Sequence, residues 1–141
     1  MGTTFTSGNL TYKITKASGN EFTVQVVKAD KKIKSSVTIP ATVTYKKQSF
    51  KVTSIAKNAF KKNSKLKKVV IGKNVTSIGK QAFYGCKNLI KVTFKSGKVE
   101  QIGSKAFTKT NKKITFKVGK KNVKKYTEKL KKKVPATAEI K

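Results

Sequence analysis

The stretch VTSIGKQAFYGCKNLIKVTF, from Val75 to Phe94, has related copies on both sides of it in this 141-residue chain. The copy before it begins VTSIAKNAF, and the copy after it begins VEQIGSKAF. The step between equivalent phenylalanines is 23 residues from Phe60 to Phe83 and 24 residues from Phe83 to Phe107. Repetition at such a period indicates similar structural units stacked on one another, so we expect a solenoid.

Each copy leads into a short strand-like run in which apolar and polar residues alternate. Side chains at alternate positions of an extended chain point to the same face. The residues expected to point into the core are Val69 with Ile71, Val92 with Phe94, and Ile114 with Phe116. We expect one such strand per repeat, paired in parallel with its neighbours, while the Val, Ile and Phe of each motif close the core from the other side.

The segment from Val75 to Phe94 resembles the repeats of the BspA-like leucine-rich repeat family, and the resemblance covers residues 36–116. It implies an α/β solenoid, which is a short leucine-rich repeat stack with parallel β-strands and short helical turns. It also implies a scaffold used by bacterial cell-surface proteins in adhesion or host contact. A cysteine is common in this family at the place of Cys86, which implies a structural role for that side chain.

The residues before the repeats predict a β-hairpin. Apolar and polar residues alternate from Leu10 to Ile14 and again from Phe22 to Val26, on either side of a Ser-Gly-Asn turn. An exposed apolar end of a solenoid would aggregate. We therefore expect this hairpin, within residues 3–35, to form an N-terminal cap.

A second hairpin is expected inside the first repeat. The distance from Ile39 to Ile71 is 32 residues, where one repeat would give 23. Within it, apolar and polar residues alternate from Val43 to Val52 about a polar tip, which is typical of a hairpin.

The C-terminal residues predict a helix. Val123, Tyr126 and Leu130 fall on one helical face, and Pro135 lies just beyond the expected end. The family resemblance also implies a final extended run within residues 136–140. We therefore expect one domain over residues 1–141, with the repeats at 36–116 and a C-terminal helical cap at 117–141.

The charge of the chain is strongly one-sided. All 35 basic residues are Lys and they face five acidic residues, so the net charge is +30. Such a charge attracts polyanions and opposes compaction through self-repulsion. Two interpretations stay open, because the lysines could bind an anionic partner or could simply solubilise the exposed positions.

The sequence is poor in residues that carry chemistry. It has no His and five scattered acids, whereas acid–base catalysis and metal binding need such groups brought together. Cys86 has no evident base and is expected to be small buried filler. Gly79 and Gly103 share one repeat position and are expected to serve a backbone turn rather than a phosphate loop. We therefore predict no enzyme activity, no cofactor and no metal.

The outward positions of the predicted strands form columns on one face. The first column is Lys68, Lys91 and Lys113; the second is Thr38, Val70, Thr93 and Thr115; the third is Gly72, Lys95 and Lys117. Solenoids commonly bind partners on such a surface. The predicted binding face comprises Lys68, Lys91, Lys113, Lys95, Lys117, Thr93 and Thr115.

Two functions fit these observations. The first is a non-enzymatic interaction or adhesion scaffold of a larger bacterial protein, which binds a protein or a host or cell-surface ligand. The alternative is a binder of anionic polymers, such as teichoic acid, acidic glycans or nucleic acid without sequence preference. Sequence-specific DNA reading is disfavoured, because guanine contacts favour Arg and the chain has none.

The chain contains no apolar run near the ~18 residues of a transmembrane helix and no export signal pattern. Strand-like sequence follows directly after Gly2, which favours a domain cut from a longer protein. We expect a monomer with an extracellular or cell-surface location.

Overall fold

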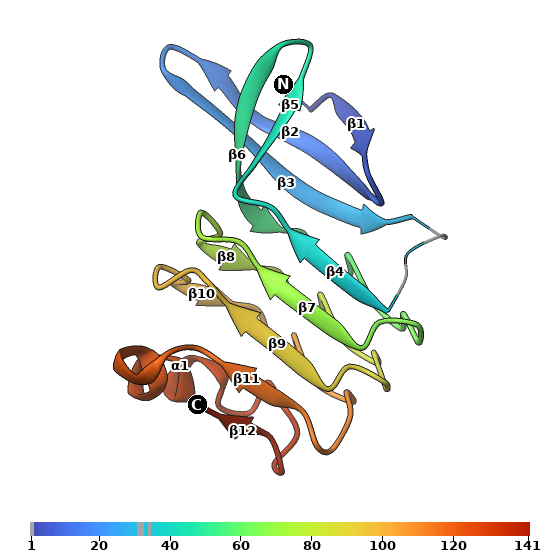
Figure 1. The fold of residues 1–141 in the computed structure, drawn as a ribbon, viewed down its shortest axis with the longest axis vertical. Coiled ribbons are helices and arrows are strands. Elements are labelled where there is room, and N and C mark those ends of the chain that lie inside the picture. Colours follow the sequence, from blue (N-terminus) through green and yellow to red (C-terminus); the bar gives the residue numbers. More distant parts are fainter. Residues whose placement is uncertain (1, 31–32, 34) are drawn as a thin grey trace.

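The computed structural model describes residues 2–30, 33 and 35–141, and its strands form two sheets that lie one behind the other (Figure 1). The front sheet is parallel and has the strand order β12-β11-β9-β7-β4. Its strands are β4 (Ser36–Ile39), β7 (Lys68–Ile71), β9 (Lys91–Phe94), β11 (Thr115–Lys117) and β12 (Glu139–Ile140). Each predicted strand of the repeats is therefore present, and the expected parallel pairing is confirmed.

The second sheet has the order β1-β2-β3-β6-β8-β10, with β5 paired to β6. Its strands are β1 (Thr4–Ser7), β2 (Leu10–Ser18), β3 (Glu21–Ala29), β5 (Thr42–Tyr45), β6 (Gln48–Ile55), β8 (Ser77–Ile78) and β10 (Gln101–Ile102). The chain passes from one sheet to the other in every repeat. The repeats therefore coil into a β-solenoid.

The prediction of short helical turns within the repeats is wrong. Between strands the chain makes hydrogen-bonded turns, such as the turn in which Ala82 N–H donates to Gly79 C=O at 3.2 Å. Asn58, Gln81 and Lys105 occupy equivalent positions with φ of 61°, 55° and 57°, and a left-handed residue at every repeat interrupts a right-handed helix. The repeats are consequently all-β rather than α/β.

The returning segments pair with one another as closely as strands do. Phe60 N–H donates to Ala82 C=O at 2.7 Å, and Phe83 N–H donates to Ala106 C=O at 2.8 Å. The phenylalanine rings stack in the same direction, with centroids 4.9 Å apart for Phe60 and Phe83 and 5.0 Å apart for Phe83 and Phe107. This buried ring stack, Phe60-Phe83-Phe107, runs through the core between the two sheets.

The pairing of β11 differs from the sequence prediction. Thr115 lies opposite Lys91 and Phe116 lies opposite Val92, so the predicted alignment of Lys113 with Lys91 is wrong. The extra residue of this 24-residue repeat lies in the loop after β9, where Ser96 is buried and its hydroxyl donates to Val75 C=O at 2.7 Å. Ile114 and Phe116 are both buried, as expected.

Both predicted hairpins are present. β2 and β3 pair antiparallel, and β5 pairs antiparallel with β6. Contrary to the simple two-stranded hairpin of the prediction, β1 adds a further strand to β2, and β3 continues in parallel onto β6. The N-terminal strands thus extend the second sheet; residues 31, 32 and 34 of the expected cap lie outside the described residues, and its capping role stays a prediction.

The predicted C-terminal helix is present as α1 (Val123–Leu130), preceded by the 3₁₀ turn η1 (Lys120–Asn122). Tyr126 and Leu130 are buried. The hydroxyl of Tyr126 donates to Ser96 C=O and accepts a hydrogen bond from Val99 N–H at 3.2 Å. The helix therefore closes over the last repeat, and the expected final run adds β12 to the front sheet.

We expect Gly103→Ala to destabilise the fold strongly. A Cβ at this position would lie 2.6 Å from the carbonyl carbon of Gly79 in the preceding turn, and that backbone cannot move aside without breaking the pairing between turns. The free energy of unfolding should fall by about 1–3 kcal/mol or more in urea denaturation. The matched control is Gly97→Ala, whose Cβ would have its nearest neighbour, Nδ2 of Asn122, at 3.5 Å. Equal losses in both variants would contradict this explanation.

Candidate binding groove on the parallel sheet

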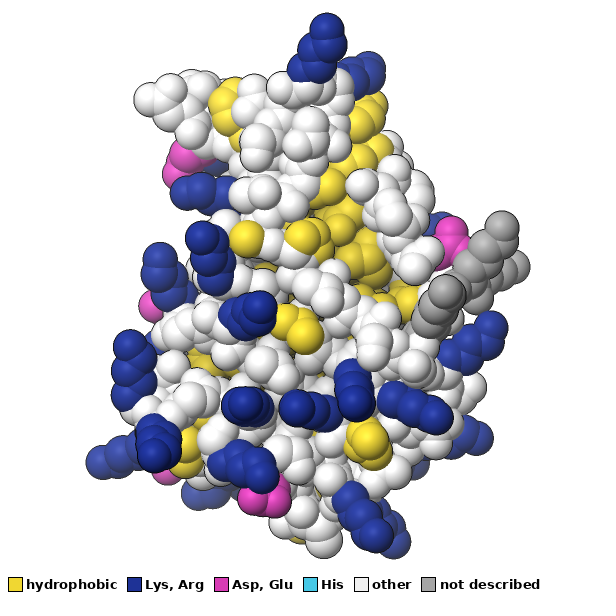
Figure 2. Space-filling model, in the orientation of Figure 1, with side chains coloured by type: hydrophobic (Ala, Val, Ile, Leu, Met, Phe, Trp, Pro, Cys, Tyr) yellow, Lys and Arg dark blue, Asp and Glu magenta, His cyan; other side chains and the backbone are white. Residues whose placement is uncertain are grey.

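A groove of about 590 Å³ crosses the solvent-facing side of the front sheet. Five residues of the predicted binding face line it: Lys68, Lys91, Lys113, Thr115 and Lys117. Ile90, Asn111 and Lys141 complete its lining. Figure 2 shows Lys side chains gathered over the lower half of this face, where β7, β9 and β11 lie. We call this feature the lysine groove.

The strand register sets the spacing of the lysines. Lys68 of β7 lies directly beside Lys91 of β9, and Thr115 of β11 lies beside Lys91 on the other side. Neighbouring strands are about 4.8 Å apart. Lys117 pairs with Thr93 one step further along the strands. The cationic side chains therefore form a staggered cluster rather than two straight columns.

Two predicted residues lie outside the groove. Lys95 follows the end of β9, is exposed, and its N–H donates to Ile71 C=O at 2.9 Å. Thr93 is half-buried between Val70 and Lys117. Neither side chain lines the groove, although Thr93 lies beside Lys117, which does.

Three lining residues were missed by the sequence prediction. Ile90 is 39 % exposed, and it is the only large hydrophobic side chain so exposed in the part of the chain that the structure describes. It follows the buried Leu89 at an outward position, which was a usable signal. Lys141 reaches the groove because β12 pairs with β11, with Lys141 N–H donating to Phe116 C=O at 2.9 Å. A final extended run had been expected, but its pairing with β11 had not.

The lysine groove has little internal charge compensation. Lys16 forms an ion pair with Glu21 on the N-terminal hairpin, and Lys141 forms one with Glu139 at 3.6 Å. Only the second adjoins the groove. Two unit charges at strand spacing repel by less than about 1 kcal/mol in bulk water, so the fold tolerates the cluster and the groove remains strongly positive.

The described residues include no cluster of metal-ligating side chains. No group of three His, Cys, Asp or Glu side chains lies close enough to hold a metal ion in the described ranges. Cys86 is buried, and its thiol donates to Phe60 C=O at 3.0 Å. The cysteine thus fills space beside the ring stack, in agreement with its expected structural role.

The thiol of Cys86 should resist alkylation until the protein unfolds. Burial raises its pKa from 9.0 to about 11, so the folded protein holds the thiol in its unreactive protonated form. Because the folded pKa is the higher one, this group stabilises the fold fully below pH 9.0 and loses that effect as the pH rises towards 11. Iodoacetamide labelling near neutral pH, followed by mass spectrometry, should need urea to reach completion. Rapid labelling of the folded protein would contradict the burial.

Thermal stability should rise with added salt. The net charge of +30 makes the compact state repel itself, and about 0.5 M sodium chloride shortens the screening length to a few ångströms. The unfolding midpoint, followed by circular dichroism, should therefore increase from low salt to this concentration. A midpoint that stays constant or falls would show that self-repulsion is negligible.

Comparisons with solved structures show related solenoids in bacterial proteins. A leucine-rich cell-surface protein from Faecalibacterium prausnitzii is 30 % identical with a TM-score of 0.67, and the match covers 81 % of this chain and 30 % of that one. This chain thus spans less than a third of that protein. A leucine-rich repeat protein from Bacteroides capillosus matches over 98 % of both chains with a TM-score of 0.71 and 21 % identity, which shows the fold alone.

No curated protein matches the sequence. The sequence does match the family model described as "BspA type Leucine rich repeat region (6 copies)" over residues 53–132. That range begins in β6 and ends just after α1, so it includes the ring stack and most of the lysine groove. The chain belongs to the BspA-type leucine-rich repeat family.

Proposed function

We propose that this chain is a non-enzymatic interaction module of a larger bacterial surface protein, and that its partner binds in the lysine groove. Family membership supports an interaction scaffold. The similar protein from Faecalibacterium prausnitzii is described as a cell-surface protein, which supports an extracellular or surface location. The described residues include no helix long and apolar enough to cross a membrane.

The observation that carries this proposal is the composition of the groove. Its cations come from the three neighbouring strands β7, β9 and β11 and from residues beside β11 and β12, and they line the groove together with the exposed side chain of Ile90. Exposed apolar residues within a polar rim are typical of protein-binding surfaces. A protein or host-surface ligand with an acidic rim and a small apolar centre would match it.

A second candidate is the binding of anionic polymers. Lys68, Lys91, Lys113, Lys117 and Lys141 line one groove of about 590 Å³, and Glu139 is the acidic residue that pairs with one of them. Teichoic acid, an acidic glycan or nucleic acid without sequence preference would gain affinity there by releasing counterions. Sequence-specific DNA reading would not, because the chain has no Arg.

The test compares two triple variants with equal net charge. The groove triple is Lys91→Gln, Lys113→Gln and Lys117→Gln; the matched control is Lys13→Gln, Lys28→Gln and Lys124→Gln, at exposed positions outside the groove. Affinity for purified wall teichoic acid should fall about tenfold or more in the groove triple, and its log–log salt slope should flatten by roughly two to three. The control should change affinity by a few-fold at most.

The outcomes separate the two candidates. Equal losses in both triples would show that the lysines act through total charge, and would remove the groove as a polymer site. If teichoic acid does not bind but the groove triple still loses attachment to host cells or intact bacteria, the protein-binding scaffold is supported. Attachment that neither triple changes would overturn the groove as the binding face.

A further inference from the structure

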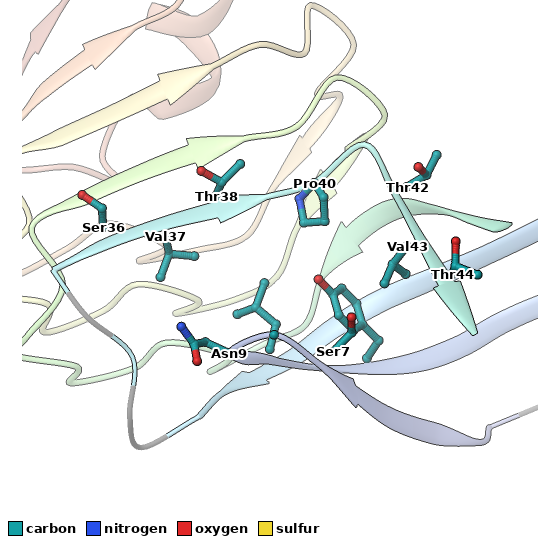
Figure 3. Close-up of a pocket in the computed structure, with 12 residues that line it drawn as sticks. Ser7, Asn9, Ser36, Val37, Thr38, Pro40, Thr42, Val43 and Thr44 are labelled. Carbon is teal, nitrogen blue, oxygen red and sulfur yellow. The ribbon is translucent and has the colours of Figure 1, made fainter. Parts of the chain in front are cut away.

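A second cavity, of about 470 Å³, lies at the other end of the front sheet. Strand β4 and the start of β5 form one wall, and the turn between β1 and β2 forms the opposite wall (Figure 3). Figure 3 shows Val37 on β4 pointing toward Asn9, while Ser36 and Thr38 point away. We call this cavity the β4 pocket.

The β4 pocket exists because the two sheets end at different levels. The second sheet continues from β6 through β3, β2 and β1, whereas the front sheet ends at β4. Within the described residues, β7 is the only strand that pairs with β4. The front sheet therefore lacks a strand at the level of the N-terminal strands (Figure 1), and one edge of β4 is open.

The open edge presents main-chain hydrogen-bonding groups. Lys68 N–H donates to Ser35 C=O at 3.0 Å, so the carbonyl of Ser35 faces β7. Main-chain groups of alternate residues in a strand face opposite edges. The N–H and C=O groups of Ser36 and Thr38 consequently face away from β7, on the side where the pocket lies. A strand laid against this edge would find two donors and two acceptors.

The floor of the pocket is apolar and uncharged. It includes Leu10 and Tyr12 from β2, Val37 from β4 and Val43 from β5. Figure 2 shows hydrophobic side chains in a hollow of this part of the surface. None of the residues that line the pocket is charged, although the whole chain carries +30. The pocket is thus chemically distinct from the lysine groove.

We propose that the β4 pocket captures an extended polypeptide segment, free of Lys and Arg, as an added strand of the front sheet. The main-chain groups of Ser36 and Thr38 pair with its backbone, and its alternate apolar side chains enter the pocket, where they contact the small exposed parts of Leu10, Val37 and Val43. A second copy of this chain does not fit the pocket's chemistry, because each copy brings a charge of +30. The short length of β4, four residues, predicts weak, reversible binding.

The test uses a synthetic peptide, acetyl-Ser-Val-Thr-Val-Thr-Val-Ser-amide, with the full chain. Isothermal titration or fluorescence should show saturable binding whose affinity changes by less than about twofold between low salt and about 0.5 M sodium chloride, because no counterions are released. Amide hydrogen exchange at Ser36 and Thr38, followed by NMR, should slow when the peptide is added. No binding at millimolar peptide would overturn the proposal.

Two N-methylated peptides test the strand pairing itself. Methylation of the three Val amides blocks one edge of the peptide, and methylation of the two Thr amides blocks the other edge. Binding should be lost with one peptide and kept with the other. If both bind, or if neither does, the contact is not a backbone pairing along one edge, and the proposal fails.

Protein variants locate the site. Thr38→Pro removes one main-chain donor on the open edge while leaving the ladder to β7 intact, and proline is tolerated at such positions; affinity should fall about tenfold. Val43→Thr keeps the volume of the side chain and makes the pocket floor polar, so it should also weaken peptide binding. This variant tests the site independently of Thr38→Pro. Lys91→Gln in the lysine groove is the control. Binding that survives both pocket variants, or that fails only in the control, would overturn the assignment.

Discussion

The stacking of one phenylalanine on the next determines how the turns of this solenoid fit together. Phe60, Phe83 and Phe107 lie face to face with centroids 4.9 Å and 5.0 Å apart, close to the spacing of about 4.8 Å between hydrogen-bonded strands. The backbone bonds from Phe60 to Ala82 and from Phe83 to Ala106 repeat the same step in the returning segments. Because the rings, the returning segments and the front strands share one period, outward side chains of adjacent turns are held at fixed separations.

Much of this arrangement could be predicted from the alternation of apolar residues and from the period. The inward residues Val69, Val92 and Phe116, the two hairpins and the C-terminal helix follow from such patterns. The turns could not be predicted in the same way, because Asn58, Gln81 and Lys105 adopt left-handed φ without being glycines. Their conformation comes from pairing with neighbouring turns, which is a tertiary effect.

The register of β11 could have been predicted from the sequence by counting from the stacked phenylalanine. The first residue of β7, β9 and β11 stands eight residues after a stacked phenylalanine, as Lys68 follows Phe60, Lys91 follows Phe83 and Thr115 follows Phe107. The prediction aligned the last strand by residue type instead, and placed Lys113 beside Lys91. Five of the seven predicted residues line the groove, the predicted alignment of Lys113 with Lys91 is wrong, and the binding role of these residues stays a prediction. Lys141 lay beyond such reasoning, because its position depends on the pairing of β12.

The distribution of charge follows from the same packing constraint. The stacked core leaves lysine no inward position, so the described lysines lie at the outer positions of the turns. The lysine groove forms where several turns repeat lysine at neighbouring outward positions, and the β4 pocket forms where the front sheet ends beside β2 and the turn before it. The lysine groove therefore depends on the repeated turns, whereas the β4 pocket depends on where the stack of front strands ends. Since both belong to one front sheet, a polyanion held at β9 and β11 and an extended peptide held at β4 would occupy separate strands, and salt would weaken the first while leaving the second in place.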